Sequence, residues 1–304
     1  MSHICTLIAD HATRILTPAT RTKAVETLSE AGVSGPIDIR ELSDHAAYDL
    51  TFSPNAAQGT KALAAAVRHA LDPLPIDVAI MPAQGRRKKL FLADMDSTMI
   101  EQECIDEMAD VLGIKPLIAD ITERAMRGEI EFEPALRERV GLLKGLAVSA
   151  IDTVYNERIS LTPGGKELIA TMRANETTCV LVSGGFTHFT SKVAQTLGFN
   201  ANYANQLIEE NNLLTGTVSE PIQGREAKKA HLEAYAGELD IDLSNTLAIG
   251  DGANDLGMIG AAGLGVAFRA KPAVVEQADA ALLHADLTGA LYLQGYADAE
   301  IVRT

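Results

Sequence analysis

The chain has 304 residues, of which 47% are hydrophobic and 22% charged, a composition typical of a globular protein with ample core. Its formal net charge of -15 argues against broad nucleic-acid binding, because neutralising a phosphate backbone needs a positive surface. The cysteines, Cys5, Cys104 and Cys179, are scattered and odd in number, so they indicate neither a disulfide framework nor a zinc site.

The first residues, MSHICTLIAD, lack a basic region followed by a long apolar core, and the sequence nowhere runs about 18 apolar residues together. We therefore expect neither a secretion signal nor a membrane span, and we predict a cytoplasmic protein. From residue 90 onward there are 16 Lys and Arg against 32 Asp and Glu, a net charge of -16. An anionic substrate must then be received by a local cation, for which a metal ion would serve.

Residues 1–85 form the first predicted domain. Strands and helices follow one another in the order β-α-β-β-α-β, over residues 4–9, 18–31, 37–42, 47–52, 60–71 and 76–81. This order predicts a ferredoxin-like arrangement, in which two helices cover one face of a small antiparallel sheet. The order resembles the ACT-like regulatory domains of amino-acid enzymes, although the first strand-to-helix turn, residues 10–14, lacks the glycine at which those domains usually receive an amino acid. Ligand binding and homodimer formation by this domain are left open.

A short basic run separates this domain from the rest of the chain. Pro82 and Gly85 precede Arg86-Arg87-Lys88-Lys89, and a new apolar strand begins directly afterwards. We interpret residues 86–89 as a solvated linker. Nucleic-acid binding by the four basic residues is the weaker alternative.

Residues 90–304 are predicted to form an α/β domain. Apolar strands are expected at 90–93, 178–182, 246–249, 264–268 and 280–283, with helices at 164–175, 186–198, 225–236, 253–261 and 272–278. Such alternation indicates a doubly wound parallel sheet covered on both faces. Two segments interrupt it: residues 99–160, interpreted as an inserted helical cap, and residues 203–222, interpreted as a hairpin around Asn211-Asn212.

Polar residues follow the first three strands of this sheet. The first strand ends in DMDST (94–98), the second in Ser183-Gly184-Gly185, and the third in GDGAND (250–255), while Lys228 opens the preceding helix. Because ligands gather beyond the carboxyl ends of parallel strands, we expect these segments to converge on one site.

The converging side chains suit a metal ion and a phosphate group. Oxygen ligands from carboxylates favour Mg²⁺, which would offset their mutual repulsion; the carboxylates are Asp94, Asp96, Asp251 and Asp255. Lys228 supplies a second positive charge, and the hydroxyl of Ser183 and the N–H groups around Gly184 can bind phosphate oxygens. Asp94 can then attack phosphorus, and Asp96 can move the proton that the leaving alkoxide and the attacking water require.

The four motifs are similar to those of the haloacid-dehalogenase-like superfamily of phosphotransferases, over about residues 88–290. Within it the chain resembles the phosphoserine phosphatases, through Glu103, the cap sequence MRGEIEFEPALRERVGLL (126–143) and VSGGF (182–186). That resemblance implies Mg²⁺-dependent hydrolysis of O-phospho-L-serine to L-serine and phosphate, the last step of serine biosynthesis.

The resemblance also implies a role for each residue. Asp94 would be the nucleophile and Asp96 the general acid and base. The metal would be held by the Asp94 carboxylate, the Asp96 main-chain carbonyl and Asp251. The remaining assignments are Asp255 supporting the metal, Asn254 near the phosphate, Glu103 facing the substrate ammonium, Arg139 facing its carboxylate, and Met126 and Phe132 closing the apolar side. A zwitterionic substrate needs such an anion and cation, and Arg can grip a carboxylate with two hydrogen bonds.

Other functions remain open from the sequence. One is a phosphatase or phosphotransferase for another small phosphorylated amine or alcohol. Another is a module without catalysis, either a phosphoaspartate receiver or an amino-acid sensor. His188 and Cys104 lie close to the motifs, but we assign neither a catalytic role.

Overall fold

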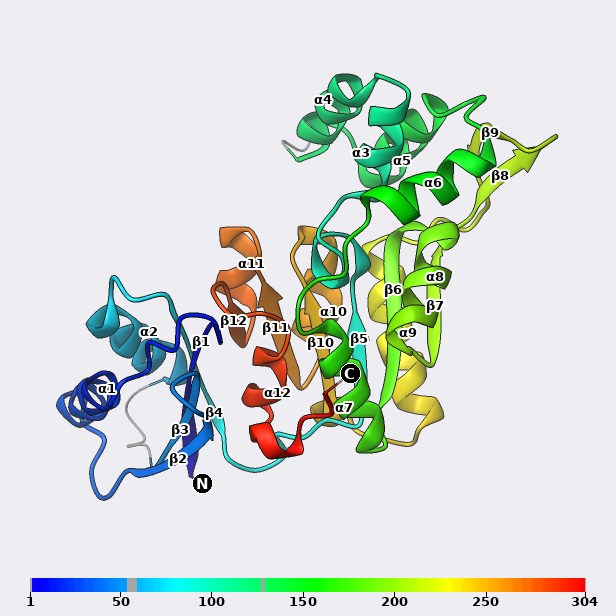
Figure 1. Ribbon diagram of the computed structural model, residues 1–304. Helices are drawn as coiled ribbons and strands as arrows, with labels where there is room; N and C mark the ends of the chain where they lie inside the picture. Colours follow the sequence, from blue (N-terminus) through cyan, green and yellow to red (C-terminus); the bar gives the residue numbers. More distant parts are fainter. Residues whose placement is uncertain (1, 54–58, 127–128, 304) are drawn as a thin grey trace.

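The computed structural model describes residues 2–53, 59–126 and 129–303, and Figure 1 shows their arrangement. A small sheet from the N-terminal part of the chain lies beside a larger sheet, and a group of helices stands beyond one end of the larger sheet. Among the described residues, no helix has both the length and the apolar character that crossing a membrane requires.

The N-terminal elements match the sequence prediction to within one residue at each end. They are β1 (His3–Ala9), α1 (Pro18–Glu30), β2 (Asp38–Ser43), β3 (Ala47–Phe52), α2 (Thr60–Leu71) and β4 (Ile76–Pro82). The strands form an antiparallel sheet in the order β2-β3-β1-β4. Side chains alternate between its faces, so Leu7 packs under α1 and α2 whereas Ile8 packs into the core of the larger part of the molecule. The second face of this sheet is therefore covered by the rest of the chain.

The prediction of a solvated linker is wrong for two of its four basic residues. Arg86 and Lys88 are buried, whereas Arg87 and Lys89 are exposed. Burial alternates along the segment, and the two buried side chains meet partners on both parts of the molecule. Arg86 binds the Asp49 carboxylate of β3, with Nη1 to Oδ2 at 2.6 Å, and Lys88 Nζ donates to the Ser244 carbonyl at 2.6 Å.

The large sheet has six parallel strands in the order β12-β11-β10-β5-β6-β7. Its strands are β5 (Leu90–Ala93), β6 (Thr178–Phe186), β7 (Ala201–Asn205), β10 (Thr246–Gly250), β11 (Leu264–Phe268) and β12 (Ala280–Leu282). The helices between and after them are α7 (Gly165–Ala174), α8 (Thr187–Leu197), α9 (Arg225–Glu238), α10 (Leu256–Ala261), α11 (Pro272–Gln277) and α12 (Gly289–Leu293).

Both faces of this sheet are buried. On β5, Phe91 belongs to a core cluster with residues of α7, α8 and α12, whereas Leu92 belongs to another with residues of α9 and α10. Successive strand residues point to opposite faces, so the two clusters lie on opposite sides of the sheet. The predicted doubly wound α/β architecture is confirmed.

The inserted segment is helical, as predicted, and the hairpin joins it. The elements are α3 (Cys104–Val111), α4 (Lys115–Met126), α5 (Phe132–Gly141) and α6 (Val148–Arg158), with β8 (Leu207–Glu210) and β9 (Leu213–Val218). Asn211 and Asn212 have φ values of 52° and 61°, which make the tight turn between the two strands. Backbone bonds link Gly145 N to Leu214 O at 2.8 Å and Leu214 N to Leu146 O at 2.8 Å. We call these helices and the hairpin the cap; they stand together at the top of Figure 1.

The start of the predicted hairpin is wrong. Residues 203–205 belong to β7, which pairs in parallel with β6 at the edge of the large sheet, and the hairpin begins at Leu207. The edge strand reads ANYAN and is mostly half-buried, so it lacks the continuous apolar run by which the other strands were predicted.

Candidate active site

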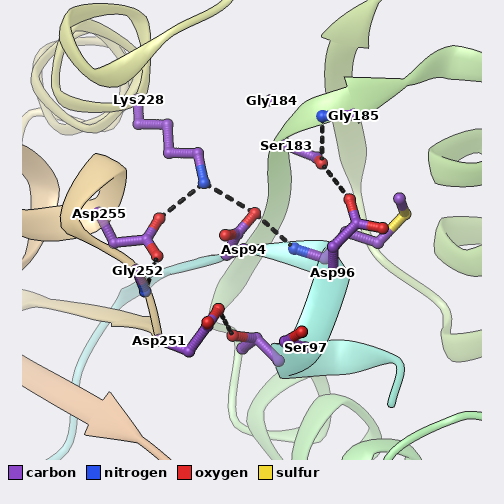
Figure 2. A network of polar contacts seen from close by, with 12 residues as sticks. Asp94, Asp96, Ser97, Ser183, Gly184, Gly185, Lys228, Asp251, Gly252 and Asp255 are labelled. Atoms are coloured by element: carbon purple, nitrogen blue, oxygen red, sulfur yellow. Dashed lines mark hydrogen bonds and ion pairs between the residues drawn. The ribbon is translucent and has the colours of Figure 1, made fainter. Parts of the chain in front are cut away.

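The predicted site residues meet where the order of the strands reverses. From β5 the chain adds β6 and β7 on one side and β10, β11 and β12 on the other, which leaves a crevice beyond the carboxyl ends of β5 and β10. Asp94 directly follows β5, and Asp251 directly follows β10. Figure 2 shows these side chains, together with Ser183 of β6 and Lys228 of α9, facing one another.

The chain after β5 makes a single wide turn over Met95–Met99 that separates the two carboxylates of the first motif. Ser97 takes a left-handed conformation in this turn, with φ 55°, which costs a residue other than glycine about 1 kcal/mol. Asp94 Oδ1 accepts a hydrogen bond from Met95 N at 2.7 Å. Asp96 turns the other way, and its Oδ1 accepts from Cys104 N at 2.9 Å while its Oδ2 accepts from Ser183 Oγ at 3.1 Å.

Lys228 contacts the same carboxylate oxygen of Asp94 that accepts from Met95 N. Its side chain is 1% exposed, and its Nζ lies 2.7 Å from Asp94 Oδ1 and 2.6 Å from Asp255 Oδ1. Burial by itself would lower the pKa of Lys228, but Asp255 and Asp94 outweigh burial and raise it. Lys228 therefore carries its positive charge inside the protein.

The carboxylates of Asp94, Asp251 and Asp255 offer oxygen atoms that all lie within 4.8 Å of one another. Burial and the charge of Asp255 raise the pKa of Asp251 to about 6 and hold the pKa of Asp94 well above its usual value. One lysine does not neutralise three carboxylates, so the cluster retains excess negative charge when all are ionised. Oxygen ligands in such an arrangement fit a hard divalent cation.

Two further contacts complete this cluster. Thr98 Oγ1 donates to Asp251 Oδ1 at 3.2 Å, and Gly252 N donates to Asp255 Oδ2 at 3.0 Å. Asn254 lies over Gly252, since a Cβ added at Gly252 would come within 2.2 Å of Asn254 Oδ1. Asn254 therefore lies beside the acidic cluster, and its expected place near the phosphate stays a prediction.

Ser183 and Asp96 form a second polar group on the β6 side of the crevice (Figure 2). Ser183 is 1% exposed, and its Oγ accepts from Gly185 N at 2.8 Å while it donates to Asp96. A Cβ at Gly185 would lie 2.6 Å from Asp96 Oδ2, so a glycine is needed here for the carboxylate to approach. Burial raises the pKa of Asp96, although the bonds from Cys104 and Ser183 act in the opposite direction.

Glu103 and Arg139 are an acidic and a basic side chain on the cap side of the crevice. Glu103 Oε1 accepts from Ser97 Oγ at 2.7 Å, and desolvation by the surrounding protein, followed by the charge of Asp96, raises the Glu103 pKa to about 8. Solvent still reaches this side chain, whose residue is exposed. Arg139 is half-buried and donates from Nη1 to Thr122 Oγ1 at 3.4 Å. Burial lowers the pKa of Arg139. Nearby acidic groups raise it again, and Glu103 has the largest effect among them.

The Phe132 ring of the cap packs against the backbone at Gly184 and at Gly224. A Cβ added at Gly184 would lie 3.3 Å from its Cζ, and one added at Gly224 would lie 3.2 Å from its Cδ1. The predicted apolar partner, Met126, is the last residue of α4, and its side chain lies outside the described part of the structure.

Sequence reasoning missed three contributors to the site: the hydroxyl of Thr98, the main-chain N–H of Cys104, and the side chain of Asn205, which binds the Gly184 carbonyl at 2.8 Å. Thr98 lies inside the first motif and could have been found there. Burial and the charge of Asp96 hold the Cys104 pKa well above its usual value, so its thiol stays protonated. His188 Nε2 contacts Glu209 Oε1 of the hairpin at 2.6 Å.

Fold and site together define the class: a doubly wound α/β protein whose switch point holds clustered carboxylates and a buried lysine, an arrangement suited to receiving a phosphate group beside a cation. Residues 91–259 match the haloacid dehalogenase-like hydrolase family. A phosphoserine phosphatase from Polaromonas sp. is 46% identical over 215 residues, which cover 69% of this chain and 91% of that protein. The chain therefore belongs to the haloacid dehalogenase-like hydrolases and, within them, to the phosphoserine phosphatases.

Solved structures agree with this placement. A phosphoserine phosphatase with an analogue of the phospho-aspartyl intermediate is 40% identical, with a TM-score of 0.63, and covers 67% of this chain and 98% of that one. An unliganded probable phosphoserine phosphatase from Vibrio cholerae is 32% identical, with a TM-score of 0.78, and covers 98% of this chain and 88% of that one. Some curated relatives are longer, and the aligned segment then spans as little as 56% of their length.

Proposed function

We propose that this protein is a Mg²⁺-dependent phosphoserine phosphatase, which hydrolyses O-phospho-L-serine to L-serine and phosphate through an aspartyl-phosphate. The observation that carries this proposal is the position of Asp94, whose carboxylate contacts Lys228 and clusters with two further carboxylates at the switch point of the sheet. The names of the relatives support the substrate, and a structure of one of them contains an analogue of a phospho-aspartyl intermediate.

Phosphate binding requires positive charge and hydrogen-bond donors in this acidic crevice. Asp94, Asp251 and the main-chain carbonyl of Asp96 would hold Mg²⁺, with Asp255 in support. When bound, Mg²⁺ supplies charge compensation and polarises a phosphate oxygen. Lys228 supplies a second charge, and the Ser183 hydroxyl and the Gly184 N–H supply donors. The hydroxyl of Ser183 now donates to Asp96, so it must turn from that carboxylate to the phosphate when substrate arrives.

The chemistry then divides between two carboxylates. An Asp94 oxygen attacks phosphorus, the bond from phosphorus to the serine oxygen breaks, and Asp96 donates its proton to that oxygen. The raised pKa of Asp96 favours the protonated form that this first step needs. Once serine has left, the ionised Asp96 takes a proton from water, whose oxygen attacks phosphorus and releases Asp94 and inorganic phosphate.

Selection of the amino acid falls to the cap. Glu103 would bind the substrate ammonium and Arg139 its carboxylate, while Met126 and Phe132 close the apolar side. The charges of Glu103 and Asp96 already act on Arg139, so both ends of a zwitterion would find a partner of opposite sign in the same space. Phe132 touches the loop that holds Ser183 and Gly184, which ties the cap to the phosphate end of the site.

The domain assignment follows the topology. We assign residues 1–85 to an ACT-like domain with a ferredoxin-like fold, 86–89 to a basic linker, and 90–304 to the phosphatase domain with its helical cap over about 99–160. The strand order β2-β3-β1-β4 with two helices on one face supports the first assignment. Cytoplasmic location and homodimer formation remain predictions from the sequence.

A substrate panel tests the proposal. The specificity constant kcat/KM is measured with and without Mg²⁺ for L-phosphoserine, phosphothreonine and phosphoethanolamine, with p-nitrophenyl phosphate as the generic ester. We expect activity to require Mg²⁺ and to be highest for L-phosphoserine. A rate on L-phosphoserine no better than on p-nitrophenyl phosphate rejects the substrate while leaving the class of enzyme intact.

Charge reversal at Arg139 separates phosphoserine from amines and alcohols that lack a carboxylate. Arg139→Glu should abolish the preference for L-phosphoserine over phosphoethanolamine, because the only difference between these substrates is the carboxylate. If phosphoserine turnover survives the change, Arg139 does not bind that group. A phosphotransferase, the nearest alternative, would release less inorganic phosphate when a second alcohol such as homoserine is added.

A further inference from the structure

The ladder between β6 and β7 is interrupted beside the active site. Val182 pairs with Tyr203 and Phe186 pairs with Asn205, so β6 advances four residues while β7 advances two. The additional residues of β6 lie in the segment Ser183–Gly185, which bulges from the sheet at its carboxyl end. Backbone groups in such a bulge lose their strand partners and need others, because an unpaired buried carbonyl is costly.

Asn205 supplies the missing partner. Its side chain is buried, with the residue 2% exposed, and its Nδ2 donates to Gly184 O at 2.8 Å and to Gln223 O at 3.2 Å. Its Oδ1 accepts from Gln223 N at 2.7 Å. One amide therefore joins the bulge in β6 to the segment that leads into α9, whose first turn carries Lys228.

This amide also fixes the direction of a donor in the site. In a trans peptide the C=O and the following N–H point in opposite directions. Because the Gly184 carbonyl is held toward Asn205, the Gly185 N–H is directed toward the crevice, where it donates to Ser183 Oγ at 2.8 Å (Figure 2). Ser183 in turn contacts Asp96, so a continuous set of hydrogen bonds runs from Asn205 to that carboxylate.

The same two loops support the cap. Phe132 lies against Gly184 of one loop and Gly224 of the other, with added Cβ atoms only 3.3 Å and 3.2 Å from its ring. Gly224 directly follows Gln223, which Asn205 binds through both main-chain groups. Asn205 therefore sets the distance between Gly184 and Gly224, and with it the surface on which Phe132 packs.

We propose that Asn205 is a positioning residue that holds the phosphate-binding bulge of β6 in register with the start of α9. It thereby aligns the Ser183 hydroxyl, which the Gly185 N–H orients, with Lys228 on one phosphate. The inference rests on the proposed function for its substrate, but the phosphate site itself is common to any ester that the enzyme accepts. The side-chain amide of Asn205 binds main-chain atoms of Gly184 and Gln223, so Asn205 would act through the backbone that it holds.

The variant Asn205→Ala tests this role, and Asn202→Ala is its matched control. Asn202 lies on the same strand and is half-buried, and its Oδ1 accepts from Thr190 Oγ1 at 2.9 Å and from Ser191 Oγ at 3.4 Å. These side-chain contacts are with α8 and not with the loops. We expect Asn205→Ala to lower kcat for L-phosphoserine by about 100-fold, the scale of a misplacement near 1 Å. Inhibition by inorganic phosphate should weaken by about tenfold, the effect of one lost hydrogen bond. Asn202→Ala should change neither quantity by more than about twofold.

Three readouts separate positioning from folding. Melting temperature and circular dichroism give the folded fraction, and calorimetric titration with Mg²⁺ should give the wild-type affinity, because the clustered carboxylates do not contact Asn205. The proposal is overturned if Asn205→Ala matches Asn202→Ala in both kcat and phosphate inhibition, or if its loss of activity equals its loss of folded protein. If Asn205→Ala does not fold, the same measurements on Asn205→Asp decide, since that variant keeps the shape and the acceptor for Gln223 N.

Failure of the proposed substrate gives a different result. If the wild-type protein hydrolyses p-nitrophenyl phosphate but not L-phosphoserine, the substrate assignment falls, and inhibition by inorganic phosphate still compares Asn205→Ala with Asn202→Ala. A normal phosphate affinity in Asn205→Ala then rejects the positioning role by itself.

Discussion

Lys228 Nζ lies 2.7 Å from Asp94 Oδ1, and both side chains are buried. The same nitrogen is 2.6 Å from Asp255 Oδ1, so one ammonium bridges the carboxylate that would attack phosphorus and a carboxylate of the metal cluster. Removing one partner of a buried ion pair leaves the others uncompensated, which is far more costly than the pair is stabilising. The bridge therefore holds the acidic cluster together as well as providing charge for a phosphate.

We expect Lys228→Met to lower kcat/KM for L-phosphoserine by about 10²–10³-fold, the usual effect of losing one group that stabilises charge in the transition state. It should also destabilise the metal-free protein, because Asp94 and Asp255 then face each other without a cation. Mg²⁺ should recover part of this stability, so the rise in melting temperature on adding Mg²⁺ should be larger in the variant than in the wild type.

Lys229→Met is the control for this prediction. Lys229 is the next residue of α9, and its side chain is 43% exposed and forms an ion pair with Glu233 at 3.6 Å. Exposed pairs of this kind contribute about 0–1 kcal/mol, so activity and stability should stay close to wild type. Equal losses in both variants would mean that helix α9, and not the buried ammonium, is responsible.

Asp96→Asn should separate the two chemical steps. The amide retains the shape of the side chain and an acceptor for Cys104 N, but it can neither donate an acidic proton to the leaving serine oxygen nor take one from water. We expect kcat to fall by about 10²–10⁴-fold, the range for loss of a general acid or base. Rapid quenching with labelled substrate measures the phosphoenzyme, and unchanged steady turnover would show that another group moves the proton.

Glu103 predicts a pH dependence that differs between substrates. Its pKa of about 8 means that at neutral pH the carboxyl of the free enzyme is largely protonated, and it becomes the anion that an ammonium needs as pH rises. The kcat/KM for L-phosphoserine, which reports groups of the free enzyme, should therefore rise with pH toward about 8. This rise of kcat/KM with pH should be absent for p-nitrophenyl phosphate, which carries no ammonium. It should also be absent in the Glu103→Gln variant with either ester. A Glu103→Gln profile that keeps the rising limb would assign it to another group.

The raised pKa of Glu103 also makes the stability of the folded protein depend on pH. The folded-state pKa of Glu103 lies above the value of 4.5 for a free side chain, so the folded protein binds the proton more tightly than the unfolded chain. This contribution to stability is complete below about pH 4.5 and is lost as pH rises through about 8. Glu103→Gln should accordingly flatten the fall in melting temperature between these pH values.

The acidic core of the site could be predicted from the sequence because each part of it follows a strand that is easily read. Asp94 follows a short run of apolar residues, as does Asp251, and right-handed crossovers bring the ends of such strands to the same edge of a sheet. The pairing of Lys228 with Asp94 then follows from the position of α9. The prediction of the cap residues depended on family resemblance. Glu103 precedes α3 and Arg139 lies in α5, and no local sequence pattern indicates that either side chain faces the site.

Other features escaped prediction because their partners are distant in sequence. Strand β7 has no apolar run. Because the turn at Asn211-Asn212 is strongly indicated by the sequence, the predicted hairpin wrongly included the last residues of β7. Asn205 carries no local sign that it will bind Gly184, 21 residues earlier. Arg86 looked like a solvated residue of a basic run, although its partner Asp49 lies 37 residues before it.

Arg86 is expected to hold the N-terminal sheet against the larger part of the molecule. Besides Asp49 and Thr6 of that sheet, it donates to the carbonyls of Leu293 at 2.9 Å and Tyr292 at 2.9 Å, at the C-terminal end of the larger part. Arg86→Met should lower the free energy of unfolding by about 3–5 kcal/mol, because Asp49 is left buried without its cation. Urea denaturation followed by circular dichroism measures the change.

The adjacent Arg87 gives a matched control, since its side chain is 44% exposed and pairs with Glu300 at 2.6 Å. Arg87→Met should cost no more than about 1 kcal/mol, as exposed ion pairs do. Replacing both members of the buried pair, Arg86→Met with Asp49→Leu, should recover part of the loss because no charge then remains buried without a partner. If Arg86→Met is no more destabilising than Arg87→Met, the contacts of Arg86 do not hold the two parts together, and the apolar packing of residues such as Ile8 must do so.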